Sequence, residues 1–106
     1  MYILQFVMSG GGHVNFPCCN MEILKIHINN FLEAVRSTSP NEIEAVIFAD
    51  DAFGNHIGMV RCKYCLGYNV FDLSQDKQTE LIESNKKMAD AITKSIMSGE
   101  GWKNNE

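Results

Sequence analysis

Runs of apolar residues predict three β-strands. Tyr2–Met8 is an almost unbroken apolar run that stops at Ser9–Gly12, which is typical of a buried strand followed by a flexible loop or hairpin turn. Glu42–Ala49 alternates between apolar and other residues, and Ile57–Cys65 again carries residues that favour strands. Because the turn formers of Asp50–Asn55 separate the last two runs, those runs predict a hairpin.

A first helix is predicted from Asn20 or Met21 to about Ser37. Apolar residues recur there at steps of three and four, as one helix face requires, at Leu24, Ile28, Phe31, Leu32 and Val35. An alternative interpretation treats residues 24–28 as a strand, because apolar and polar residues alternate there, and begins a shorter helix at Asn29 or Asn30.

A second helix is predicted over Gln75–Ser98, with Asp72 or Ser74 as its N-terminal cap. Residues 67–71 are a candidate edge segment before this helix. The apolar stripe of the helix consists of Leu81, Ile82, Met88, Ala89, Ile92 and Ile96.

The resulting order, β-α-β-β-α, predicts an α+β fold in which two helices pack on a small antiparallel sheet as a two-layer sandwich. It resembles a ferredoxin-like fold without its last strand, because residues 99–106 are too short and polar to supply one. The 106 residues predict one domain, residues 1–98, followed by a polar tail, 99–106. The resemblance concerns architecture alone and carries no function.

Composition and charge exclude several classes of protein. Hydrophobic residues make up 45% and charged residues 21%, which are globular values. The net charge of −4 and the scattered basic residues disfavour binding to a nucleic-acid backbone. No apolar run approaches the roughly 20 residues of a membrane span, and no Lys or Arg precedes the first run as in a signal peptide. We therefore expect a soluble cytoplasmic protein with no membrane partner.

The cysteines are the first candidates for chemistry. Cys62 and Cys65 have the spacing of one knuckle of a zinc ribbon, and they resemble that motif over a few residues. The other ligands of such a site would be Cys18 and His13. These two ligands do not have the spacing of a second zinc knuckle. The favoured interpretation is therefore that Cys62 is a small thiol in the core. We expect no metal and no cofactor.

Two adjacent carboxylates are the second candidates. The segment from Val46 to Ala52 resembles the Phe-Ala-Asp-Asp hairpin of the reverse-transcriptase palm, which implies that Asp50 and Asp51 would hold magnesium ions for phosphoryl transfer. That family also needs a carboxylate on a neighbouring strand, and Tyr2–Met8 contains none. The favoured interpretation is that both aspartates are turn residues.

The glycines at Gly10–Gly12 are the third candidates. Bare backbone N–H groups can surround a phosphate, but the Lys-Ser/Thr pair and the immediate helix of a phosphate-binding loop are missing here. A loop or hairpin turn is therefore favoured. The three histidines, His13, His27 and His56, are far apart in the sequence, and no catalytic triad can be assembled from them.

The predicted hairpin offers a candidate interaction surface. If the alternating residues of Glu42–Ala49 that begin at Ile43 face the helices, the intervening residues must face away from them. A two-layer fold leaves that face open, and a contiguous apolar patch there marks an interface. The alternative is that residues 67–71 or the Trp102 tail cover it. The predicted partner-binding residues are Val46, Phe48, Phe53, Ile57, Met59, Arg61 and Lys63.

These patterns together predict a small, non-catalytic binding protein. We expect it to act through protein–protein interaction or self-association as a homo-oligomer. Short, mildly acidic single-domain chains of this kind are common among phage and mobile-element inhibitors of host factors. One alternative is a zinc-stabilised Cys/His module. Another is a nucleotide or phosphate binder, or a metal-dependent enzyme, that uses Gly10–Gly12 and the two aspartates.

Overall fold

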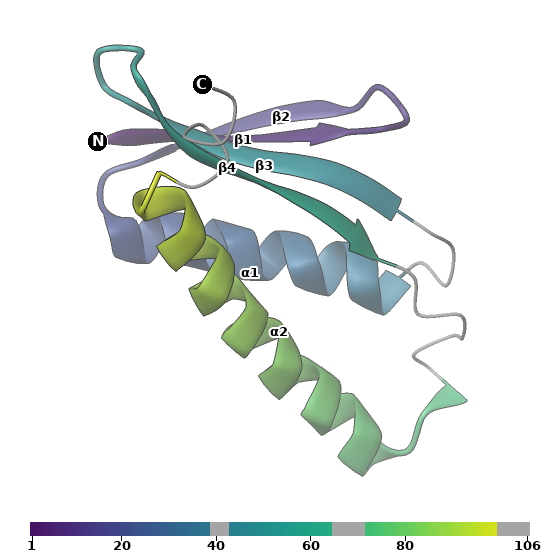
Figure 1. Ribbon diagram of the computed structural model, residues 1–106. Coiled ribbons are helices and arrows are strands. Elements are labelled where there is room, and N and C mark those ends of the chain that lie inside the picture. Colours follow the sequence, from purple (N-terminus) through teal and green to yellow (C-terminus); the bar gives the residue numbers. More distant parts are fainter. Residues whose placement is uncertain (39–42, 65–71, 100–106) are drawn as a thin grey trace.

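The protein is an α+β two-layer sandwich, as the sequence predicts. The computed structural model describes residues 1–38, 43–64 and 72–99. The four strands pair antiparallel in the order β2-β1-β3-β4, and both helices cover the same face of the sheet (Figure 1). The described elements are β1 (Tyr2–Met8), β2 (His13–Cys18), α1 (Met21–Thr38), β3 (Ile43–Asp51), β4 (His56–Tyr64) and α2 (Gln75–Met97).

Strand β2 adds to the predicted order of elements. We predicted no strand between the first strand and the first helix, whereas residues 13–18 pair with β1 along their whole length. Alternation explains the strand, since Phe16 and Cys18 face the helices while Asn15 and Pro17 face away. Pro17 is compatible with this position because β2 is an edge strand and one side of it needs no ladder partner.

A tight turn joins β1 to β2. The N–H of Met8 donates to the carbonyl oxygen of Gly12 at 2.8 Å, and the N–H of Gly11 donates back to the carbonyl oxygen of Met8 at 2.9 Å. Gly11 has a φ of +93°, a conformation that glycine adopts without strain. The hairpin-turn interpretation of Gly10–Gly12 is therefore confirmed.

Helix α1 begins where the long-helix interpretation placed it, and the strand interpretation of residues 24–28 is wrong. The side chain of Asn20 caps the helix, because its Oδ1 accepts a hydrogen bond from the N–H of Ile23 at 2.9 Å. The side chain of Val35 lies outside the described residues. The fully buried residues of α1 are spaced four apart, at Leu24, Ile28 and Leu32.

Helix α2 is capped by Ser74, as one of the two predicted caps. Its Oγ accepts a hydrogen bond from the N–H of Lys77 at 3.3 Å.

The two helices are linked by Asp90, whose carboxylate lies 2.9 Å from Lys94 Nζ and 3.2 Å from Lys25 Nζ of α1. Hydrogen bonds from Lys94 and then Lys25 hold the pKa of Asp90 below its ordinary value. The candidate edge segment at 67–71 lies outside the described residues.

The core lies between the sheet and the helices. On β1 only one face is buried, because Leu4 and Phe6 are inaccessible whereas Val7 is 37% exposed, so the prediction of a buried strand was wrong for its outer face. Alternation on β3 is as predicted for the described side chains, since Ala45, Ile47 and Ala49 all point into the core. The side chains of Ile43 and Tyr64 lie outside the described residues.

The C-terminal end of α2 lies directly on β4. Gly58 faces the helix there, and a Cβ added to it would overlap the carbonyl oxygen of Ile96 and lie 3.0 Å from its Cα. The same carbonyl oxygen accepts a hydrogen bond from the N–H of Gly99 at 3.1 Å. The backbones of β4 and α2 can therefore approach this closely because Gly58 has no side chain.

Candidate functional site on the outer face of the sheet

The face of the sheet that points away from both helices is the candidate site, and we refer to it as the outer face. Strand register brings residues of different strands into rows on this face. One row contains Gln5, Phe48 and Met59, and the next contains Val7, Val46 and Arg61. The second row borders a shallow hollow of about 220 Å³. Val7, Val46, Phe48 and Met59 thus form an apolar band over β1, β3 and β4.

The predicted partner-binding residues lie on or beside this face. Their register places Val46, Phe48, Met59, Arg61 and Lys63 on it, as strand alternation requires. The register shifts near the turn, between Ala49 and Asp50, so that Ile57 is skipped and lies half-buried at the irregularity.

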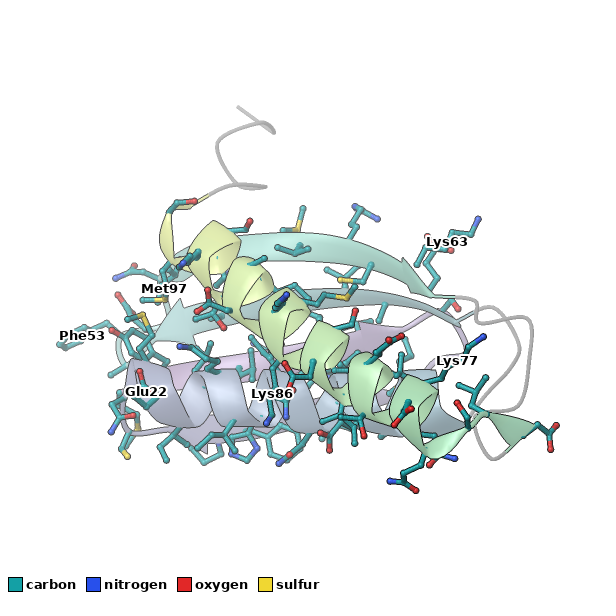
Figure 2. All side chains as sticks on the ribbon, turned by 90° about the horizontal axis from the view of Figure 1, so that it is seen from below. Glu22, Phe53, Lys63, Lys77, Lys86 and Met97 are labelled. Atoms are coloured by element: carbon teal, nitrogen blue, oxygen red, sulfur yellow. The ribbon has the colours of Figure 1, made fainter. Side chains whose placement is uncertain are left out.

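The tip of the β3–β4 hairpin carries one more predicted residue. Phe53 is 90% exposed and points away from the body of the protein (Figure 2). Residues 67–71 and Trp102, the segments considered as a cover for this face, lie outside the described residues.

Strands β1 and β2 enlarge this face beyond what the sequence predicted. Ile3, Gln5 and Val7 of β1 lie on it, together with His13 and Asn15 of β2. The pattern missed them because Tyr2–Met8 is apolar at nearly every position, which hides the alternation. The signal that was available is the alternation within residues 13–18, where His13 and Asn15 separate apolar residues.

A chain of polar side chains crosses the outer face from one edge strand to the other. His13 Nε2 lies 3.0 Å from Gln5 Oε1, and Gln5 Nε2 donates to Asp50 Oδ2 at 3.0 Å. Asp50 Oδ1 in turn lies 2.6 Å from His56 Nδ1. The Asp50 side chain is 15% exposed and that of His56 is 57% exposed. Each strand contributes one residue to this chain, which fixes the orientation of the Gln5 amide and of both histidine rings.

This polar chain corrects two expectations. Asp50 is a strand residue bonded to Gln5 and His56, so its interpretation as a turn residue was wrong. Two histidines that are far apart in the sequence, His13 and His56, belong to one network. The network contains no nucleophile, and among the described residues no three His, Cys, Asp or Glu side chains converge as metal ligands.

Asp51 is the last residue of β3, and its side chain closes the hairpin turn as the sequence predicts. Its Oδ1 accepts hydrogen bonds from the N–H groups of Phe53 at 2.8 Å and Asn55 at 2.9 Å, and its Oδ2 accepts one from Asn55 Nδ2 at 3.1 Å. The hydrogen bonds from Asn55, followed by those from Phe53 and Gly54, lower the pKa of Asp51. The two aspartates therefore have separate partners and do not converge on a common magnesium site.

The candidate zinc ligands are also separated. Cys18 is on β2 and Cys62 is on β4, at opposite edges of the sheet, and both are buried on its helix-covered face. His13 belongs to the outer face instead, because it bonds to Gln5 there. Cys65 lies outside the described residues. The structure thus does not bring Cys18, Cys62 and His13 together, and the description of Cys62 as a core thiol agrees with its burial.

We expect the cysteines to differ strongly in reactivity. Cys19 is exposed, whereas burial raises the pKa of the Cys18 thiol, with a further contribution from neighbouring Cys19. In the native protein, iodoacetamide should modify Cys19 on the order of 100-fold faster than Cys18 or Cys62. Peptide mass mapping after timed labelling measures each site, with labelling in denaturant as the control. Equal native rates at Cys18 and Cys19 would contradict the buried position of Cys18.

Comparisons with protein-family models, with curated proteins and with solved structures found no match. Within the described residues, neither helix has the length and apolar character needed to cross a bilayer.

Proposed function

We propose that this protein is a non-catalytic binding module that acts through protein–protein association, with the outer face as its contact surface. The observation that supports the proposal is the apolar band formed by Val7, Val46, Phe48 and Met59 on a sheet face that neither helix covers. Val7 is 37% exposed and the other three residues are half-buried, so that the band is partly accessible to solvent. Contiguous accessible apolar surface is characteristic of interaction sites.

The charges around the band favour association of the chain with itself. Among the residues that the structure describes, the charged side chains of the outer face are Glu44, Asp50, Arg61 and Lys63, which are two acids and two bases, in a chain whose net charge is −4. Because positive and negative charges balance on this face, two copies that meet through it experience less of the repulsion that their net negative charge causes. Charged residues surrounding an apolar centre are also the usual composition of an interface.

The size of the face sets the expected strength. Strands of 6 to 9 residues, spaced about 4.8 Å apart, give a face of roughly 500 Å² per copy. Two such faces bury roughly 1,000 Å² in total, which is the lower limit for a specific interface. We therefore expect reversible association rather than an obligate oligomer. Inhibition of a host factor, which we expected from chain length and composition, is one use of such a surface.

The test is sedimentation velocity of the wild-type chain and of the double variant Phe48→Glu/Met59→Glu over a range of concentrations. The wild type should associate reversibly, and the variant should remain a folded monomer, because two unpaired charges would have to be desolvated at the centre of the interface. The double variant Ile26→Glu/Ile82→Glu is a matched control, since it introduces the same charges at two exposed apolar positions of the helices. A monomeric wild type, or association that survives in Phe48→Glu/Met59→Glu, would contradict the proposal.

A further inference from the structure

A groove lies between β2 and α1, on the face of the sheet opposite the outer face. Its volume is about 430 Å³, which falls within the roughly 300–1,000 Å³ of typical ligand sites. Val14 is 41% exposed and belongs to its lining, as does exposed Asn30. The other principal walls are Phe6, Phe16, His27 and Phe31.

Aromatic packing holds these walls in place. Phe6 stacks on Phe31 with ring centroids 4.4 Å apart, and Phe16 stacks on His27 at the same separation. The edge of one ring meets the face of the other between Phe6 and Phe16, at 5.8 Å. The groove is thus a preformed apolar surface that carries two polar side chains, those of His27 and Asn30.

The backbone of β2 is open along the same side. Because Met8 N–H bonds to Gly12, antiparallel alternation directs the backbone groups of Val14 and Phe16 toward β1. The N–H and C=O groups of His13 and Asn15 then point away from the sheet, and in the described residues no strand pairs with them. Hydrogen-bonding groups for another strand therefore lie directly beside an apolar groove.

We propose that β2 and this groove together bind an extended peptide segment of a partner protein. The segment adds antiparallel or parallel to β2 as a further strand, about 4.8 Å away. Its backbone pairs with His13 and Asn15. Its alternate side chains, those that lie beside Val14 and Phe16, point into the groove. This surface uses the backbone of His13 and Asn15, whose side chains belong to the outer face, and it does not include the apolar band of that face.

The geometry and the charges favour this occupant. A small apolar molecule or a helix would fill the groove but leave the backbone groups of His13 and Asn15 unused. A second copy that paired through its own β2 would meet Pro17, which lacks an N–H and shortens the ladder on both sides. The groove lining contains no carboxylate, Lys or Arg, and its one ionisable group is the imidazole of His27. An uncharged segment with apolar residues at alternate positions complements such a surface.

The probe is an acetylated and amidated heptapeptide of alternating valine and threonine, with a glutamate at each end for solubility. Titration into the ¹⁵N-labelled chain should shift the amide resonances of His13 and Asn15 together with those of residues 27–34 in a saturable manner. A second peptide, N-methylated at the threonine amides, keeps the side chains but cannot pair with β2. It should bind at least about tenfold more weakly, because the backbone hydrogen bonds supply the affinity.

Variants of the protein separate the remaining possibilities. Val14→Glu should weaken binding of the heptapeptide about tenfold by placing a charge in the apolar groove, and it should stay folded because Val14 is partly exposed. Ile82→Glu adds the same charge at a distant exposed site and should bind as the wild type does. Equal binding of the N-methylated peptide would show a groove without strand pairing and overturn the proposal. Absence of binding at millimolar peptide, or a dimer that Asn15→Pro disrupts, would overturn it as well.

Discussion

Phe6→Ala should destabilise the protein by about 4 kcal/mol, near the upper end of single-residue effects. Phe6 is 1% exposed, and it contacts both strand and helix, through Phe16 on β2 and Phe31 on α1. Truncation to alanine would remove the buried ring and leave a cavity. Strand β2 and helix α1 cannot both move inward to fill it. Since small domains are stable by roughly 5–15 kcal/mol, this one change removes a large part of the total.

Urea unfolding followed by circular dichroism measures the effect of Phe6→Ala. The matched control is Phe53→Ala, because Phe53 is 90% exposed at the hairpin tip and its removal should change the free energy of unfolding by less than about 0.5 kcal/mol. Similar losses in the two variants would place Phe6 outside the core and contradict the position of α1 on β1 and β2.

Gly58→Ala should destabilise the protein by about 3 kcal/mol. The added methyl group would overlap the backbone of Ile96, and a backbone carbonyl cannot move aside as a flexible side chain can. The C-terminal end of α2 would have to shift away from β4, which opens the core around the buried side chain of Ile96. The variant adds a single carbon atom, so the loss comes from packing and not from hydrophobicity.

Gly10→Ala is the control for Gly58→Ala in the same unfolding experiment. A Cβ at Gly10 meets no atom within 4 Å, and Gly10 does not have a positive φ. This substitution should be neutral or stabilise the protein by up to about 1 kcal/mol, because it restricts the unfolded chain. If Gly58→Ala unfolds at the wild-type urea concentration, the close contact between α2 and β4 is absent.

The sequence by itself determined the fold class and most of the elements. Both helices could be predicted, because Leu24, Ile28 and Leu32 repeat at the helical period and because Ser74 is a strong capping residue. The outward direction of Val46, Phe48 and Met59 also followed from the sequence, since a period of two leaves one register that buries Ala45, Ile47 and Ala49. These are local properties, and each can be judged within one element.

The tertiary structure decided which distant residues meet. Strand β2 was hidden because Asn15 and Pro17 are poor strand formers, and Pro17 is compatible with a strand here because β2 lies at an edge of the sheet. The chain His13–Gln5–Asp50–His56 depends on the strand order β2-β1-β3-β4, which joins residues from four strands. The groove between β2 and α1 depends on how the helices pack. Periodicity specifies the faces of one strand or helix, but only packing specifies which faces lie together.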